Sequence, residues 1–341
     1  MKAMILAAGK GTRLAPLTGK CPKPLFPVGD RPVITYLFDL FRHNGIKEVM
    51  INLHHQGDLI EKTLGDGSRF SLRIEYSREK ELLGTGGAVA KARKFWGDED
   101  ILVVNGDNLL ELNLRRMLLT HQASEAVATM ALKPQGANSN YTPIYLDQES
   151  QVEAIGSSKR TESSYTFIGA QILSREFLDL LPATGPSCLV RDGYRKLLRK
   201  RKNPARITGF VSTGYWREIG TFPCYWEVSQ DFLRGRLPAY FYRGRDEFIR
   251  RGLYVAKGCD LNPRNQFVSP VYLGDGSQVG ENCQLGPRLL VGSGATVGPR
   301  CQLQDVVIWP DTTVPQESVL KNLIVTPFGN VKIAEEENGD R

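Results

Sequence analysis

The segment MILAAGKGTRLAPLTGKCPKPLFPV, residues 4–28, joins a short apolar run to a glycine-rich turn. The apolar run reads as a buried strand, and Gly9 and Gly11 follow it directly. A glycine turn after a strand lets backbone N–H groups approach phosphate oxygens closely. Arg13 offers a planar fork for such oxygens, and Lys23, held between two prolines, offers a compact point charge. The segment therefore predicts an anion-binding loop at the end of a strand.

Neither of the two standard glycine motifs for nucleotides fits this loop. The dinucleotide fingerprint needs a third glycine where Leu14 stands. The P-loop needs Ser or Thr after its Gly-Lys pair, but Gly19 and Lys20 are followed by Cys21. For the glycine-rich turn taken alone, a purely structural role therefore stays an equal alternative to phosphate binding.

Strand and helix signals alternate along the first hundred residues. Strands are expected at 3–7, 48–53, 72–77 and 100–107, and helices at 32–45, 58–67 and about 86–94. This β-α-β rhythm predicts an α/β fold with a mostly parallel sheet that is covered on both faces.

From about residue 126 to 235 the pattern of expected strands and helices changes from α/β to α+β. Further strands are expected at 126–132, 142–147, 151–155 and 166–173, and helices at 174–181, 189–202 and 222–235. The Arg/Lys cluster at 195–202 is interpreted as a solvated helix face rather than a binding patch.

A six-residue repeat runs through the C-terminal third. Every sixth residue from Leu273 to Leu303 is aliphatic, and glycine follows five of these six positions. This period is typical of hexapeptide β-helices, and the pattern resembles the left-handed parallel β-helix family over residues 256–326. We expect the repeat to loosen after Trp309, residues 236–255 to form a linker, and residues 327–341 to form a disordered tail.

Many members of that β-helix family are acyltransferases, whose chemistry commonly uses a histidine. The four histidines of this chain, His43, His54, His55 and His121, all precede the repeat. A scaffold for oligomerisation or regulation is therefore favoured over acyl transfer. Neighbouring strand residues point to opposite faces, so His54 and His55 are not expected to share a metal ion.

The composition is that of an ordinary globular protein. The chain has 341 residues, a formal net charge of +7 and six cysteines, none of which forms a CxxC motif. This modest charge does not indicate a nucleic-acid partner, and no run approaches the ~18 apolar residues of a membrane span. We expect a cytoplasmic, soluble protein with reduced thiols, no membrane partner and two domains.

The sequence GKGTRLAPLTGKCPKPLFPV resembles the signature of the sugar-1-phosphate nucleotidylyltransferases, also called NDP-sugar pyrophosphorylases. Further matching segments follow in order: INLHH (51–55), LLGTGGA (82–88), VVNGD (103–107) and YWREIGT (215–221). The resemblance covers residues 1–235 and implies a Rossmann-like catalytic domain that depends on Mg²⁺. It also implies the reaction of a sugar-1-phosphate with an NTP to give an NDP-sugar and pyrophosphate.

The resemblance assigns a role to each matching position. The nucleotide would be held by Leu6, Ala7, Ala8, Gly9, Gly11, Thr12, Arg13, Gly84, Thr85, Gly86 and Gly87. Lys23 would bridge the α-phosphate and the sugar phosphate, and Arg13 would hold the departing pyrophosphate. Asn105, Lys159 and Gly169 would serve the sugar phosphate, although Lys159 lacks the usual Glu-Lys-Pro context.

The resemblance also implies a pair of Mg²⁺ ligands, Asp107 and Glu218. Most members have aspartate at the second position, and glutamate is longer by one methylene. Mg²⁺ demands near-octahedral geometry at ~2.0–2.1 Å, so Glu218 would ligate it after a backbone adjustment or through water. The alternatives are a cap of the next turn for Asp107 and a surface pair with Arg217 for Glu218.

The implied chemistry explains why no catalytic Ser/His/Asp set is needed. The attacking sugar-phosphate oxygen is already anionic, whereas two unit charges at 4 Å repel by ~4 kcal/mol at an effective dielectric of 20. Arg13, Lys23 and a metal on Asp107 are therefore predicted as the catalytic cations of an in-line displacement.

Three readings of the whole chain stay open at this stage. The favoured one is a nucleotidylyltransferase with GTP and mannose-1-phosphate as substrates, followed by UTP with another hexose-1-phosphate. A catalytically silent paralogue would bind a nucleotide-sugar and a partner subunit, and a bifunctional enzyme would add acyl transfer. A homo-oligomer is expected in each case, because a coil stack leaves end surfaces to cover.

Overall fold

The computed structural model describes residues 1–136, 139–156, 163–199, 206–242, 252–256, 258–259 and 262–333. The chain divides into two compact units. The first comprises Met1–Lys10 and Tyr36–Trp216, and the second comprises Gly11–Thr35 and Arg217–Arg341. The loop that carries Arg13 and Lys23 therefore groups with the C-terminal part of the chain.

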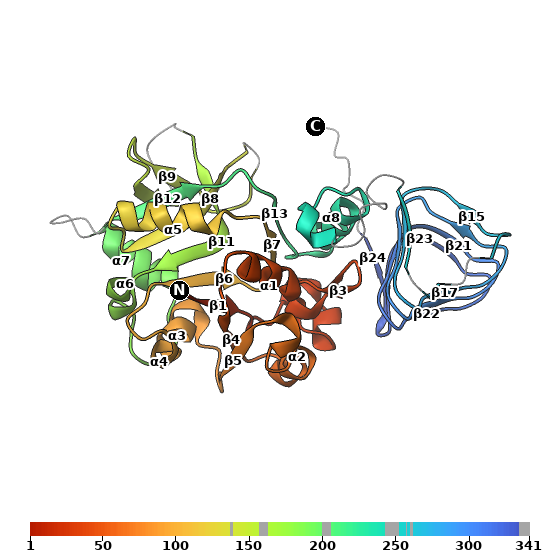
Figure 1. The fold of residues 1–341 in the computed structure, drawn as a ribbon, viewed down its shortest axis with the longest axis horizontal. Coiled ribbons are helices and arrows are strands. Elements are labelled where there is room, and N and C mark those ends of the chain that lie inside the picture. The colour runs from red at the N-terminus through yellow and green to blue at the C-terminus, as the bar shows by residue number, and fades with distance from the viewer. Residues whose placement is uncertain are drawn as a thin grey trace. The chain divides into compact units, whose positions relative to one another are not determined.

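A mixed sheet forms the centre of the first unit, with strand order β10-β9-β11-β6-β1-β4-β5 and with β8 joining β11 to β12 (Figure 1). Its strands are β1 (Lys2–Leu6), β4 (Glu48–Leu53), β5 (Arg73–Arg78), β6 (Ile101–Asn105), β8 (Ala128–Pro134), β9 (Ile144–Leu146), β10 (Val152–Ile155), β11 (Tyr165–Leu173) and β12 (Ile207–Val211). Strand β1 pairs in parallel with β4 and β6, and β11 runs antiparallel to β6. The predicted α/β fold with a mostly parallel sheet is confirmed.

Helices cover both faces of this sheet. They are α2 (Gly57–Leu64), α3 (Gly84–Lys91), α4 (Arg93–Trp96), α5 (Leu114–Ala123), α6 (Arg175–Asp179), a π-helix (Leu189–Tyr194, η5) and α7 (Arg195–Leu198), while α1 (Ile34–His43) spans the unit boundary. Met130 of β8 lies in the buried cluster with α3 and α4, whereas its neighbour Thr129 bonds His121 of α5 on the other face. Strands β1 and β6 are apolar almost throughout because both faces are buried.

Several elements differ from the sequence prediction. The helix expected at 86–94 is two helices, α3 and α4, that meet at Ala92. The helix expected at 189–202 begins as the π-helix and continues as α7 to Leu198, and its last predicted residues lie outside the described chain. Helix α5, strand β12 and the short strand β7 (Asn108–Leu110) were not predicted.

The second unit contains the predicted β-helix. Its strands are β14 (Leu253–Val255), β15 (Gln266–Phe267), β16 (Val271–Leu273), β17 (Gln278–Val279), β18 (Gln284–Leu285), β19 (Leu289–Val291), β20 (Thr296–Val297), β21 (Gln302–Ile308), β22 (Thr313–Val314), β23 (Val319–Thr326) and β24 (Gly329–Lys332). Successive coils pair in parallel, for example Val271 with Leu289, 18 residues further on. The repeating aliphatic residues fill the interior.

The repeat changes register earlier than predicted. Leu285 pairs with Leu303, 18 residues on, whereas Leu289 pairs with Val306, only 17 residues on. One residue is therefore missing between Leu303 and Val306, not after Trp309 as expected. The turn of the coil between Leu303 and Val306 is therefore one residue shorter, and β21 runs through it without a break. The buried aliphatic positions resume at Ile308 and Val314.

The remaining elements of the second unit belong to the signature loop and to the segment before the β-helix. They are three 3₁₀ turns, η1 (Thr12–Leu14), η2 (Leu17–Gly19) and η3 (Lys23–Leu25), the hairpin β2 (Pro27–Val28) and β3 (Arg31–Pro32), helix α8 (Phe222–Leu233) and η6 (Ala239–Tyr242). Strand β13 (Trp216–Glu218) lies at the unit boundary. At the far end, β24 turns back and pairs antiparallel with β23. Of the predicted tail, residues 327–341, the structure describes 327–333, which include β24, and the rest lies outside the described residues.

Candidate active site

The carboxyl end of β1 is the first part of the site. Leu6 pairs with Asn52 of β4 and with Asn105 of β6, so three strands end side by side. Ala7 and Ala8, which follow Leu6, are buried. The Ala7 N–H donates to Asn52 Oδ1 at 2.7 Å. Ligands of such folds bind at this end of a parallel sheet, and the nucleotide contact of Leu6, Ala7 and Ala8 stays a prediction.

A buried polar network joins this strand end to the start of α3. Asn52 Nδ2 donates to Glu79 Oε1 at 2.8 Å, and the Leu83 N–H donates to Glu79 Oε2 at 2.9 Å. Asn52 and Glu79 are only 3% and 6% exposed. Sequence reasoning missed Glu79, and no spacing or motif around it signals the role. The network fixes the Ala7 turn relative to the LLGTGGA segment.

The glycines of LLGTGGA are required by close packing against another chain segment. A Cβ atom at Gly84 would lie 2.6 Å from the Ser187 carbonyl oxygen, and one at Gly87 would lie 2.6 Å from the Gly185 carbonyl oxygen. The Gly86 N–H donates to the same Ser187 carbonyl at 2.9 Å. Close packing against residues 185–187 therefore explains these glycines, and their contact with the nucleotide stays a prediction.

The third part of the first unit is the NGD motif after β6. The Gly106 N–H donates to the Leu6 carbonyl at 2.9 Å, which places this turn against the end of β1. Gly169 of β11 has φ +76°, and a Cβ atom there would lie 2.0 Å from Asn108 Nδ2 and 3.0 Å from Asn105 Nδ2. The structure thus brings Asn105 and Gly169 together, and Asp107, two residues after Asn105, is half-buried.

The signature loop of the second unit folds around Gly11. This residue has φ +62°, and a Cβ atom there would lie 2.9 Å from Thr18 Cγ2 and 3.6 Å from Lys23 Cβ. Thr18 Oγ1 also donates to the Gly11 carbonyl at 3.1 Å. Gly11 and Lys23 are therefore held together, with Lys23 half-buried. In the same loop, burial raises the pKa of the Cys21 thiol to about 12.

Arg13 and Glu218 meet at Gly220 in the second unit. A Cβ atom on Gly220 would lie 2.9 Å from Glu218 Oε1 and 3.2 Å from Arg13 Nη2. The glycine of YWREIGT therefore leaves room for both side chains. Arg217 is engaged by α8, because its Nε donates to Asp231 Oδ2 at 2.6 Å.

The predicted catalytic and metal-binding residues divide between the two units. Asp107 lies in the first unit, and Arg13, Lys23 and Glu218 lie in the second. That these side chains converge on the α-phosphorus of the NTP stays a prediction. Lys159, which was predicted to bind the sugar phosphate, lies outside the described residues. Among the described residues no group of three or more His, Cys, Asp or Glu side chains could hold a metal ion. His54 Nδ1 lies 3.1 Å from the Glu79 carbonyl oxygen.

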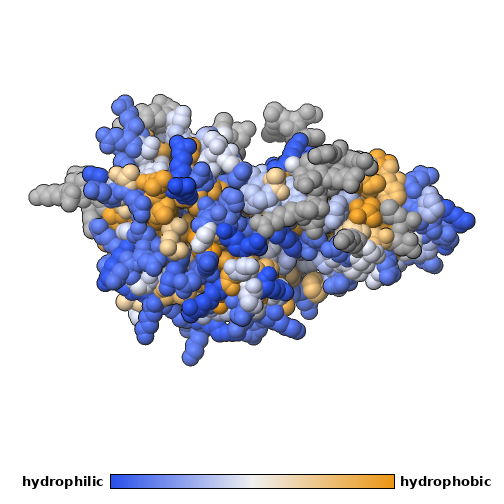
Figure 2. Space-filling view, in the orientation of Figure 1, coloured by the Kyte–Doolittle hydropathy of each residue, from blue (hydrophilic) through white to orange (hydrophobic). Residues whose placement is uncertain are grey.

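Within the described residues, no helix combines the length and the apolar character needed to cross a bilayer. The face drawn in Figure 2 is largely hydrophilic, with hydrophobic residues in small areas.

Residues 2–235 match the family described as nucleotidyl transferase. The chain belongs to this family. The resemblance to the sugar-1-phosphate nucleotidylyltransferases is confirmed, and so is the prediction of an enzyme of this type.

Two curated relatives cover most of the chain. The mannose-1-phosphate guanylyltransferase of Mycobacterium tuberculosis is 30% identical, over 83% of this chain and 77% of its own. The UTP–glucose-1-phosphate uridylyltransferase of Synechocystis is 29% identical, over 85% of this chain and 78% of its own. Among solved structures, HddC from Yersinia pseudotuberculosis complexed with GMP-PN has a TM-score of 0.58 at 23% identity, and the match covers 68% of this chain and 99% of that one. This last likeness concerns the fold alone.

Proposed function

We propose that the protein transfers a nucleotidyl group from an NTP to a sugar-1-phosphate, giving an NDP-sugar and pyrophosphate. GTP and mannose-1-phosphate are the favoured substrates, and UTP with another hexose-1-phosphate comes next. The observation that carries the proposal is the family match over residues 2–235, which includes the whole signature loop. The mannose-1-phosphate guanylyltransferase named above supports the choice of substrates.

The reaction forms one P–O bond and breaks another. A phosphate oxygen of the sugar-1-phosphate attacks the α-phosphorus of the NTP, and pyrophosphate leaves from the opposite side. No proton has to be removed from this nucleophile, since it is already an anion. The residues must instead hold two polyanions in line and offset their repulsion.

Each proposed contact uses a residue of suitable chemistry. Lys23 would neutralise the α-phosphate and the incoming sugar phosphate, and Arg13 would hold the departing pyrophosphate through its planar fork. Ala7, Ala8 and the LLGTGGA segment would hold the base and ribose in the first unit. Asn105 and Gly169, which the fold brings together, would contact the sugar phosphate.

Mg²⁺ is the expected cofactor of the family. Asp107 and Glu218 offer carboxylate oxygens, which are the donors that Mg²⁺ prefers, so the donor set fits this ion. When bound, Mg²⁺ neutralises charge on the phosphate oxygens. Titration of Mg²⁺ into wild type and Glu218→Gln tests the second ligand, and an unchanged affinity would count against Glu218.

A pyrophosphate-release panel of four NTPs against six sugar-1-phosphates tests the proposed function. We expect release to be fastest with GTP and mannose-1-phosphate. Release with a different pair would change the substrates but keep the reaction. If no pair releases pyrophosphate while the protein still binds a nucleotide-sugar, the silent paralogue replaces this proposal.

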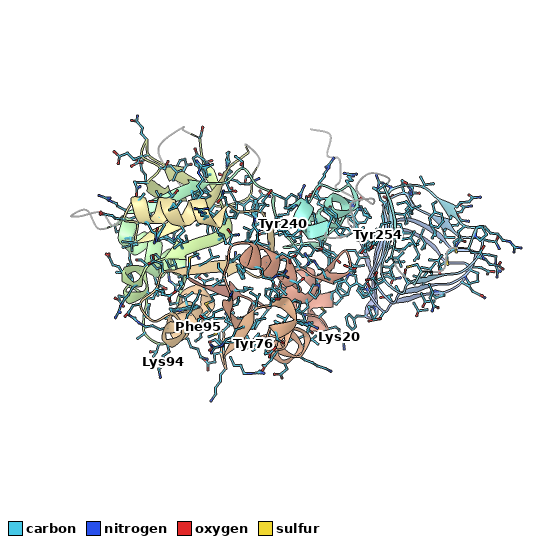
Figure 3. The ribbon with its side chains drawn as sticks, viewed as in Figure 1. Lys20, Tyr76, Lys94, Phe95, Tyr240 and Tyr254 are labelled. Carbon is cyan, nitrogen blue, oxygen red and sulfur yellow. The ribbon has the colours of Figure 1, made fainter. Side chains whose placement is uncertain are left out.

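The role of Lys23 is tested by a matched pair of variants in the same loop. Lys23→Ala should lose most turnover, because the cation that offsets phosphate repulsion is removed. Lys20→Ala changes the same residue type three positions earlier, at an exposed site labelled in Figure 3, and should retain turnover. A Lys23→Ala variant with near-wild-type kcat would refute the assignment.

A further inference from the structure

Phe26 fixes the turn that presents Lys23. The Phe26 N–H donates to the Lys23 carbonyl at 3.0 Å and closes the η3 turn. The Phe26 carbonyl accepts from the Val33 N–H at 2.9 Å, and the Phe26 side chain is fully buried. The position of this ring therefore determines where the backbone of Lys23 lies.

The Phe26 ring packs against a residue of the β-helix. Trp309, which follows β21, has its ring centroid 4.8 Å from that of Phe26, in an edge-on arrangement at 68°. Tyr225 of α8 completes the cluster at 5.7 Å from Phe26. Within the described residues, the buried Trp309 Nε1 has no hydrogen-bond partner. Packing against these rings, rather than a polar contact, therefore accounts for the placement of Trp309.

A second contact joins the same loop to the preceding coils. Tyr272 of β16 donates from its hydroxyl to Asp30 Oδ2 at 3.0 Å. Phe232 of α8 packs edge-on against Tyr272 with centroids 5.0 Å apart. A Cβ atom on Gly29 would lie 2.6 Å from Phe232 Cζ, so the hairpin lies directly on α8. The loop is thus held at both ends of the β2–β3 hairpin.

We propose that Trp309 and Tyr272 of the β-helix are positioning residues for Lys23, acting through Phe26 and Asp30. The inference rests on the proposed function, in which Lys23 serves the α-phosphate. The outward side chains of a stacked parallel coil are held by the ladder beneath them, so they give the loop a rigid support. The β-helix then forms part of the catalytic scaffold.

The test compares Trp309 with its neighbour Ile308. Ile308 is fully buried in the β-helix core, and adjacent strand residues point to opposite faces, so Ile308→Ala disturbs the coil without touching Phe26. Trp309→Ala should lower kcat by about 10- to 100-fold, as expected for a displaced catalytic group, and Trp309→Phe should restore most of it. Ile308→Ala should stay within about threefold of wild type.

A readout that does not depend on turnover is the alkylation rate of Cys21, two residues before Lys23. Its thiol is partly buried in the folded loop. Release of the loop in Trp309→Ala should speed alkylation of Cys21 by about tenfold or more, and Ile308→Ala should not. If the wild type shows no nucleotidyl transfer at all, the proposed function fails, but this rate still tests the support of the loop.

A gentler pair of variants covers the case in which Trp309→Ala does not fold. Tyr272→Phe removes only the hydroxyl that bonds Asp30, and it should raise the Cys21 alkylation rate and lower kcat. Tyr254, labelled in Figure 3, stacks on Tyr272 with centroids 4.8 Å apart, so Tyr254→Phe is the matched control. Unchanged kcat and Cys21 reactivity in both Trp309→Ala and Tyr272→Phe would overturn the proposal.

Discussion

Glu79→Gln tests the buried network at the end of β1. The two carboxylate oxygens of Glu79 accept from Asn52 Nδ2 and from the Leu83 N–H. Glutamine has nearly the same shape but carries one amide nitrogen, so in either orientation one of the two donors faces another donor. A hydrogen bond to a charged group contributes ~1.5–3 kcal/mol, and a buried donor left unsatisfied costs a similar amount. We therefore expect a loss of ~1.5–3 kcal/mol in the free energy of unfolding.

The same change should also affect nucleotide binding, because the network sets the position of Leu83 relative to Ala7. The KM for the NTP should rise by about tenfold, which corresponds to ~1.4 kcal/mol, while the KM for the sugar-1-phosphate changes little. Urea unfolding followed by circular dichroism gives the stability, and pyrophosphate release gives both constants. Glu81→Gln, the same change at an exposed site two residues away, is the control. If Glu79→Gln matches this control in both measurements, the network does not hold the site.

Three further predictions use other parts of the structure. Gly169→Ala should destabilise the first unit by ~1–3 kcal/mol in thermal or urea unfolding, since φ is +76° and a Cβ atom would lie 2.0 Å from Asn108 Nδ2; Gly19→Ala, where nothing lies within 4 Å, should be tolerated. Cys21, whose pKa burial raises to about 12, should react with iodoacetamide about 10³-fold more slowly in the folded protein than in urea, as followed by peptide mass spectrometry; equal rates would contradict its burial. Burial also lowers the pKa of His121, so the neutral ring is favoured in the fold. The contribution of His121 to the free energy of unfolding is therefore complete above the unfolded pKa of about 6.5 and is lost as the pH falls below that value. His121→Gln should flatten the pH dependence of the free energy of unfolding between pH 7 and 5.

The strands of the catalytic sheet could be predicted because a strand that is buried on both faces has a nearly continuous apolar sequence. Ile101–Asn105 and Lys2–Leu6 are nearly continuous apolar runs, and only a covered parallel sheet accounts for both. Helix α5 was missed because half of the residues in its sequence LRRMLLTHQA are polar. The one available signal was Asn113, whose side chain accepts from the Arg116 N–H and caps the helix.

The candidate site was predictable only where its residues form a motif. Gly11, Arg13 and Lys23 stand close in sequence, and their spacing carried the prediction. Glu79 lies 27 positions from Asn52, and its role depends on a pairing that arises only when β4 and β5 lie side by side. The contact of Phe26 with Trp309 spans almost the whole chain, and no local pattern encodes such a contact.

The antiparallel strand β24 has a consequence for how the protein behaves in concentrated solution. A stack of parallel coils ends in a row of unpaired backbone groups, which a neighbouring molecule could use to continue the sheet into a filament. Strand β24 pairs with this row over Leu323–Thr326 and runs in the opposite direction, so a molecule that approached there would meet a strand of the wrong polarity to continue the parallel coils. A chain cut after Thr326 should therefore lose its solubility before it loses its fold.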